Sequence, residues 1–169
     1  MDKVTEERLA SFSLFSGLDK AQRQRIAQLV RLRKTAAGET IVTEGEIGSE
    51  MFLLLSGEIV ISQRLTLYSS EGEDKREKSL IKLEDKDNVF FGEMSMFDDA
   101  ERSATVTAVS DVTCGILNRE QIKVLCEEDP KVGYQVYYNI GRTLSAYLRG
   151  ANRNVLKLTT AFCLALDRS

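Results

Sequence analysis

One stretch of the chain, residues 90–108 (FFGEMSMFDDAERSATVTA), combines a glycine, a carboxylate, a short apolar turn and an arginine beside small hydroxyl residues. Gly92 lets the backbone approach a ligand closely and adopt angles that a side chain forbids. The residues from Glu93 through Met94 to Phe97 are typical of one helical turn. Because a helix start presents unpaired N–H groups and a positive dipole end, it favours an anion. The stretch predicts half of a phosphate site.

The other half follows at Arg102. Its planar guanidinium matches two phosphate oxygens, Ser103 adds a hydroxyl, and Ala104 adds an unobstructed backbone N–H. An ionised Glu93 only accepts hydrogen bonds, so it suits the hydroxyl of a ribose better than a phosphate. Together these residues predict a site for the sugar and phosphate of a nucleotide.

The plain alternative is that Gly92 only makes a turn and that Glu93 and Arg102 form a surface ion pair, worth about 0 to 1 kcal/mol. Each residue taken singly fits that interpretation. The combination and its order favour a nucleotide pocket, either functional or degenerate.

The stretch resembles the phosphate-binding cassette of the cyclic-nucleotide-binding domain family through two runs, Gly92-Glu93 and Arg102-Ser103-Ala104-Thr105. That family includes the bacterial cAMP receptor protein, kinase regulatory subunits and cyclic-nucleotide-gated channels. The resemblance implies that Glu93 binds the ribose 2'-hydroxyl and Arg102 the cyclic phosphate. It implies supporting contacts from the other candidate ligand-binding residues: Gly92, Met94, Ser103 and Ala104. The resemblance extends from about Phe12 to Tyr147.

Two features of the sequence concern recognition of the nucleotide base. The spacing from Gly92 to Arg102 is that of the kinase subunits, one residue shorter than in the bacterial receptor. Where that receptor's dimer helix places a Thr-Ser pair on the adenine, an ungapped match puts Tyr147 and Leu148 here. We expect the Tyr147 ring to lie against the purine, with a place in a dimer seam as the alternative. Because Ser103 suits a guanine as readily as a phosphate, cAMP is favoured only slightly over cGMP.

Composition limits the possible functions. The 169 residues are of single-domain size and 43% are hydrophobic. With 23 basic and 26 acidic residues the formal net charge is −3, so no nucleic-acid partner is expected. The N-terminus is too charged for a secretory signal, and no apolar run approaches the roughly 20 residues of a membrane span. We therefore expect a cytoplasmic protein without a membrane partner.

The chain has no histidine. Many β-barrel enzymes of similar size hold a metal through clustered imidazoles, and histidine is the usual general base near neutral pH. We therefore expect neither an enzyme nor a metal site. The three cysteines lack a C-x-x-C spacing and predict reduced, small hydrophobic residues.

The pattern around this stretch predicts a mainly β fold with flanking helices, a double-stranded β-helix or jelly-roll barrel. Residues 4–15 and a segment opened by an Asp19 to Gln22 capping box predict two N-terminal helices. Ser56-Gly57 predicts a tight hairpin between two apolar runs. Residues 66–79, polar and mixed in charge, are expected to interrupt the strands as a long solvated hairpin tip.

A long C-terminal helix is predicted to begin at Asp129-Pro130 and to continue to near Asp167, with a possible break at Gly150. Apolar and small residues three and four apart predict a coiled-coil seam and a homodimer. Packing of the helix on its own barrel is the alternative. The seam positions are Tyr137, Ile140, Leu144, Tyr147, Ala151, Asn154, Leu158, Ala161 and Ala165. We divide the chain into a cyclic-nucleotide-binding barrel, 1–129, and a helical lid or dimerisation segment, 130–169.

The leading hypothesis is a stand-alone sensory module whose barrel binds a cyclic mononucleotide and whose C-terminal helix then repacks to signal to an unknown effector protein. A second hypothesis is an interaction or scaffold protein that keeps the fold but binds no ligand. A barrel enzyme is the third, and the lack of histidine weighs against it.

Overall fold

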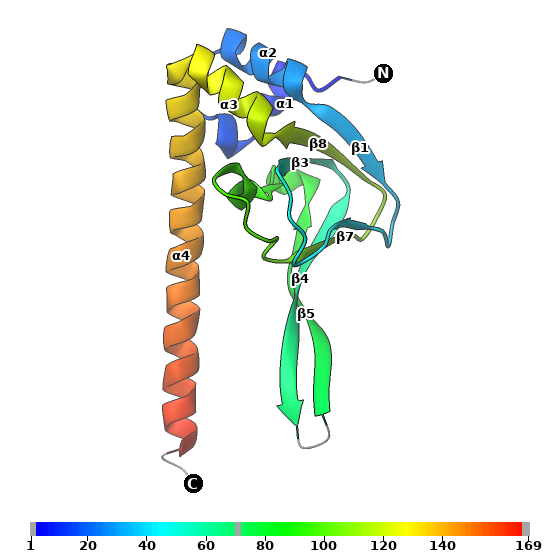
Figure 1. The fold of residues 1–169 in the computed structure, drawn as a ribbon, viewed down its shortest axis with the longest axis vertical. Helices are drawn as coiled ribbons and strands as arrows, with labels where there is room; N and C mark the ends of the chain where they lie inside the picture. The colour runs from blue at the N-terminus through cyan, green and yellow to red at the C-terminus, as the bar shows by residue number, and fades with distance from the viewer. Residues whose placement is uncertain (1–2, 70–71, 167–169) are drawn as a thin grey trace.

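The computed structural model describes the backbone of residues 3–69 and 72–166, and the side chains of these residues outside 65–80. Within them, antiparallel strands form two four-stranded sheets (Figure 1). One sheet has the order β1-β8-β3-β6, with bounds Arg31–Thr35, Val112–Asn118, Glu50–Ser56 and Phe90–Phe91. The other has the order β2-β7-β4-β5, with bounds Thr40–Val42, Thr105–Ala108, Glu58–Ser69 and Gly72–Glu84. The predicted jelly-roll fold with flanking helices is confirmed.

Helices enclose this β-roll at the N- and C-terminal ends of the chain. They are α1 (Glu6–Ala10), α2 (Lys20–Leu29), α3 (Arg119–Glu128) and α4 (Pro130–Leu166), with the short 3-10 helices η1 (Ser13–Phe15), η2 (Asp85–Asp87) and η3 (Glu93–Met96). The predicted capping box is present, because Asp19 accepts from the Gln22 N–H and the Gln22 side chain accepts from the Asp19 N–H. The expected first helix, 4–15, is two shorter ones. The Ser11 hydroxyl donates to the Arg8 carbonyl where α1 ends.

The core has two layers because β3 is buried on both faces. Met51 and Leu53 belong to an apolar cluster shared with the helices. Phe52 and Leu54 belong to a second cluster between the two sheets. Successive side chains of a strand point to opposite faces, so one short apolar run supplies both layers.

The predicted hairpin at Ser56-Gly57 is wrong. Gly57 has the expected positive φ of 91°, but the strands on either side of it, β3 and β4, lie in different sheets. A side chain at Gly57 would also collide with the Asp111 carbonyl oxygen. A glycine turn between two apolar runs looks the same in sequence whether the chain folds back within a sheet or crosses to the facing one.

The hairpin predicted at residues 66–79 is present, but the predicted interruption of the strands there is wrong. Strands β4 and β5 continue through it in antiparallel register as far as the pair Ser69 and Gly72. In residues 66–79 the large apolar residues are Leu67 and Tyr68 alone, so the sequence lacks the alternation that indicates a half-buried strand. The predicted solvation of its side chains concerns residues outside those described.

Helix α4 begins where predicted, with the Val132 N–H 3.4 Å from Asp129 Oδ1, and continues through Gly150 without the suggested break. Its first part is core, because Val132, Val136 and Ile140 are buried against the other helices. Residues 151–166 are exposed throughout and extend past the β-roll (Figure 1). The predicted boundary at residue 130 stays a prediction.

The two parts of α4 predict unequal responses to truncation of a side chain. Ile140→Ala removes a side chain that is 1% exposed, and it should cost about 2 to 5 kcal/mol of unfolding free energy. Leu156→Ala changes a side chain 68% exposed on the same helix and should cost at most about 0.5 kcal/mol. Chemical denaturation followed by circular dichroism measures both. Equal losses would contradict this division of the helix.

Candidate functional site

Gly92 begins the turn that carries the first candidate residues. It has a left-handed φ of 75° and precedes η3, whose Ser95 N–H lies 3.2 Å from the Gly92 carbonyl oxygen. A Cβ added at Gly92 would lie 2.8 Å from Nη1 of Arg102 and 3.1 Å from the Glu50 carbonyl oxygen. Both the backbone angle and the space therefore require glycine here. The predicted single helical turn is confirmed as a 3-10 turn.

Arg102 reaches back from the strand side toward this turn. Its Nη1 donates to Ser95 Oγ at 2.5 Å and lies 3.5 Å from the Gly92 carbonyl oxygen. The guanidinium carbon is 5.7 Å from the ring centroid of Phe52, which stacks on Phe91 at the floor of the barrel. Burial lowers the pKa of Arg102, against the opposing charges of nearby carboxylates. The result is a half-buried cation held beside a glycine turn.

Sequence reasoning missed the partners of this cation. A side chain at Gly48 would collide with the Arg102 guanidinium, so this glycine provides the space that the arginine occupies. The Arg102 N–H donates to the Glu46 carbonyl oxygen at 2.8 Å, which joins the two loops. The 44–48 turn was visible in the sequence as glycines between acidic residues, but nothing in it indicated which side chain would fill the gap.

Glu93 lies at the same turn but faces inward, and only 7% of the residue is exposed. Burial raises the pKa of its carboxyl group; a backbone hydrogen bond of Glu93 and the charge of Arg102 act in the opposite direction. Within the described residues Glu93 and Arg102 form no ion pair at 4 Å or less. Glu93 and Arg102 therefore do not form the surface ion pair that was considered as the plain alternative.

The cavity at this turn measures about 50 Å³. Five of the predicted residues line it, namely Gly92, Glu93, Met94, Arg102 and Ser103, while Ala104 and Tyr147 do not. Pockets that enclose a small molecule usually measure about 300 to 1,000 Å³. This cavity is therefore smaller than a pocket that encloses a nucleotide.

Tyr147 lies on α4 and is 55% exposed. Partial burial raises the pKa of its phenol, and the negative charge of Glu93 raises it further. The ring is therefore on the side of α4 within electrostatic reach of the turn, without lining the cavity.

Two contacts connect this turn to the C-terminal helices. Arg119, at the start of α3, donates through Nη1 to the carbonyl oxygens of Ser95 (3.3 Å) and Asp98 (2.6 Å) and pairs with the Asp99 carboxylate. Phe97 meets Tyr137 of α4 edge-on, with 5.6 Å between ring centroids. The turn that carries Glu93 is thus fixed to both α3 and α4.

Three further observations concern disulfides, metal ligands and membrane spans. No disulfide joins the cysteines: Cys114 is buried, with a pKa raised to about 12 by burial, and Cys163 is exposed. Among the residues placed by the structure, none of the Cys, Asp and Glu side chains gather in threes as a metal would need. None of the helices in that part of the chain is long and apolar enough to span a bilayer.

The fold and this glycine–arginine site define a class of protein, and the comparison with known families agrees. Residues 32–129 match the family described as "Cyclic nucleotide-binding domain". The chain belongs to this family, and the resemblance expected from the cassette, here residues 92–104, is confirmed.

Its relatives include a "CRP-like cAMP-activated global transcriptional regulator" of Mycobacterium tuberculosis, 26% identical over 153 residues that cover 90% of this chain and 62% of the relative. A "cAMP-dependent protein kinase regulatory subunit" of Dictyostelium discoideum is 28% identical over 73% of this chain and 36% of the relative. The solved Catabolite Activator Protein of Thermus thermophilus is 28% identical, with a TM-score of 0.72, covering 87% of this chain and 63% of that one. The chain thus spans less than two thirds of the length of these relatives.

Burial of Glu93 predicts a pH-dependent stability. Because the folded-state pKa is raised above the ordinary 4.5, the folded chain binds more protons than the unfolded chain between the two values, and stability falls as pH rises through them. Glu93→Gln should therefore be more stable than the wild type at pH 7, and the difference should shrink as the pH is lowered through the raised pKa. Thermal unfolding against pH measures this. A difference that does not change with pH would contradict the burial argument.

Proposed function

We propose that the chain is a cyclic-nucleotide-binding regulatory module, not an enzyme, that binds a cyclic mononucleotide at the cassette and signals through α4. The carrying observation is Arg102, a half-buried cation whose Nη1 donates, among the residues that the structure describes, to the neutral Ser95 hydroxyl and the more distant Gly92 carbonyl oxygen. A charged acceptor is a stronger partner for a guanidinium than a neutral hydroxyl. A cytoplasmic location stays a prediction.

Each cassette residue then has a role. A cyclic phosphate replaces Ser95 as the partner of Arg102, with Ser103 and Ala104 beside it, and Glu93 accepts from the ribose 2'-hydroxyl. Burial of Glu93 favours this role, because a buried carboxyl group needs a hydrogen-bond partner. The relatives named for cAMP support an adenine nucleotide, so we keep cAMP slightly ahead of cGMP.

The signal passes from the cassette to the C-terminal helices. When the phosphate draws Arg102 off Ser95, η3 loses a contact that holds its present position. Arg119 binds the Ser95 carbonyl oxygen, and Phe97 packs on Tyr137, so a shift of η3 changes the packing of α3 and α4. The ligand acts by favouring one of two positions of α4 over the other.

Tyr147 is proposed as a stacking lid. It stands on the side of α4 toward Glu93 and keeps half of its surface exposed. A base stacked on an aromatic ring gains on the order of 1 to 3 kcal/mol with little regard to its hydrogen-bonding edge. Such a lid accepts adenine and guanine alike, in keeping with a slight base preference.

The exposed half of α4 is proposed as a homodimer seam. The predicted seam began at Tyr137, but Tyr137, Ile140 and Leu144 pack on the chain's own core. Beyond them the predicted seam ran through Tyr147, Ala151, Asn154, Leu158, Ala161 and Ala165. We propose instead the more apolar series at the same three- and four-residue spacing: Leu148, Ala151, Val155, Leu158, Phe162 and Ala165. Its large members are all more than half exposed in the single chain. This spacing is that of a coiled-coil seam.

One observation favours the second candidate, a scaffold without ligand. The cavity of about 50 Å³ is smaller than a pocket that encloses a nucleotide. The two functions differ in whether cAMP binds at all.

Calorimetric titration with cAMP and cGMP tests the site. Arg102→Ala should weaken binding about 100-fold or more, because it leaves the phosphate unpaired, and Glu93→Ala by about tenfold, because it removes a hydrogen bond to a neutral hydroxyl. Arg25→Ala, which breaks an ion-pair cluster on α2 with Glu128 and Asp129, is the control and should leave affinity unchanged. No binding to the wild type would favour the scaffold; equal small losses would move the site elsewhere.

Truncation after Gly150 tests the seam. The shortened chain keeps Val132, Val136 and Ile140 in its core, so it should stay folded, and it keeps Tyr147 for the ligand. Light scattering should show a dimer for the full chain and a monomer for residues 1–150, while cAMP binding persists. An unchanged dimer would overturn the helix-mediated interface.

A further inference from the structure

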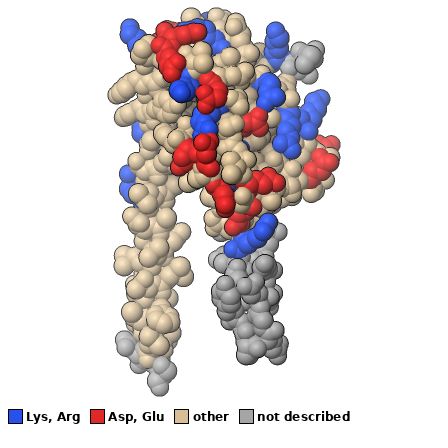
Figure 2. Space-filling view, viewed as in Figure 1, with Lys and Arg blue, Asp and Glu red and all other residues tan. Residues whose placement is uncertain are grey.

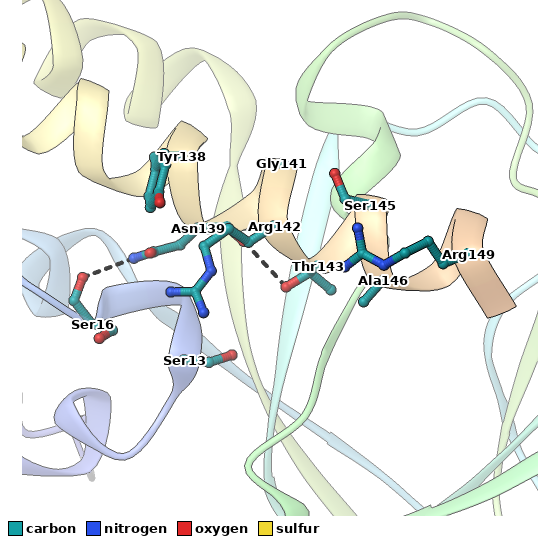
Figure 3. Close-up of a pocket in the computed structure, with 10 residues that line it drawn as sticks. All are labelled: Ser13, Ser16, Tyr138, Asn139, Gly141, Arg142, Thr143, Ser145, Ala146 and Arg149. Carbon is teal, nitrogen blue, oxygen red and sulfur yellow. Dashed lines mark hydrogen bonds between the residues drawn. The ribbon is translucent and has the colours of Figure 1, made fainter.

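A groove on the other side of α4 is unrelated to the cassette. It measures about 880 Å³ and lies between η1 and the middle of α4 (Figure 3). Asn139 builds it, because its buried side chain donates to the carbonyl oxygens of Leu14 (2.9 Å) and Ser16 (2.8 Å) and so holds the η1 loop beside the helix. Gly141 leaves the groove wall open, because no atom lies within 4 Å of the position that a Cβ would take at this residue.

The lining of this groove is hydroxylic and basic. Ser13 and Ser16 stand on the η1 side, and Arg142 extends from α4 toward them in Figure 3. Arg149 lies about two turns further along the helix, and Ser145 lies between the two arginines in sequence. In the part of the chain that the structure describes, neither guanidinium has a hydrogen bond or ion pair. Both are therefore free to bind an anion.

The charge of α4 is one-sided. Residues 130–166 contain no Asp or Glu and five basic residues, on a chain whose net charge is −3. Steps of seven and of eleven residues along a helix are each close to a whole number of turns. One side of α4 therefore carries Lys131, Arg142, Arg149 and Arg153. In Figure 2, basic side chains appear at the edge of α4 that faces away from the β-roll, and no acidic ones appear on its lower half.

Aromatic surface adjoins this basic side. Tyr138 lines the groove and stacks on Tyr134, with ring centroids 5.8 Å apart, and both are largely exposed. Exposed tyrosine beside arginine is the composition of residues that dominate binding energy in protein interfaces. A helix face that contacts only solvent requires neither a groove nor stacked aromatic rings.

We propose that this groove docks an acidic segment of a partner protein, with one carboxylate on Arg142 and a second on Arg149. The planar guanidinium fork matches a carboxylate, and the neighbouring serine hydroxyls donate to its remaining lone pairs. The two arginines are roughly 10 Å apart along the helix axis, which matches glutamates seven residues apart on a partner helix. The aromatic pair then packs on the apolar part of that segment.

The groove does not compete with the seam of Leu148, Val155 and Phe162, which lies on another side of α4, about a third of a turn away. Nor does it favour a long polyanion, because η1 bounds the groove and limits its length. An effector segment can therefore bind while the chain is dimeric. It also contacts α4 directly, so a movement of α4 would reach it.

Fluorescence anisotropy tests the proposal on the full chain. The probe is a labelled alanine-rich helical peptide with glutamates seven residues apart; the matched control peptide has glutamine in their place. The glutamate peptide should bind saturably and more weakly with added salt, and the glutamine peptide should not bind. Arg142→Gln should weaken binding about tenfold or more. Lys123→Gln, an exposed position on α3 outside the groove, removes the same charge and should leave binding unchanged.

An unchanged far-ultraviolet circular dichroism spectrum and an unchanged unfolding temperature in Arg142→Gln confirm that the variant is folded. Absence of saturable binding by the glutamate peptide overturns the proposal, as does an equal loss in Lys123→Gln. Tighter, Arg142-dependent binding of duplex DNA or of phosphatidylserine vesicles would assign the groove to a nucleic acid or a membrane instead.

Discussion

The placement of Arg102 is the constraint on which the ligand-binding end of the molecule depends. Moving a cation out of water is costly unless its donors are satisfied, and here one donor meets the Ser95 hydroxyl and the Gly92 carbonyl oxygen over the Phe52 ring. Two glycines follow from this placement, since a side chain at Gly48 or Gly92 would occupy the space of the guanidinium. The site is therefore shaped around an arginine that a stronger acceptor can recruit.

The η3 turn also connects the candidate site to the C-terminal helices. Arg102 donates to the Ser95 hydroxyl, and Arg119 donates to the Ser95 carbonyl oxygen. A single residue of η3 therefore joins the barrel to the start of α3. Phe97, at the end of that turn, reaches Tyr137 in the buried part of α4. Because packed elements shift between discrete arrangements and do not deform continuously, these two contacts are the basis of our proposal that a displacement at the cassette changes the packing of α3 and α4.

The sequence predicted what is encoded locally. The jelly-roll class, the Asp19 capping box, the start of α4 and the cassette turn each depend on neighbouring residues, and the structure bears these out. The errors are non-local. Whether Gly57 turns within a sheet or between sheets depends on which strands pair, and the space for Arg102 at Gly48 depends on two loops meeting. The roles of Glu93, Arg102 and Tyr147 toward a ligand stay predictions.

In helix α4, one periodic pattern runs through two different environments. Residues 137–144 and 148–165 carry the same three- and four-residue spacing, but the first set is buried against the chain's own helices and the second is not. Periodicity reports that a face is apolar and leaves open what covers it. Beyond the barrel, the side chains on that apolar side are exposed, while Arg142 and Arg149 on the basic side lie beside a groove without a hydrogen bond or ion pair to any residue that the structure describes. One helix that starts in the core thus presents two chemically distinct surfaces.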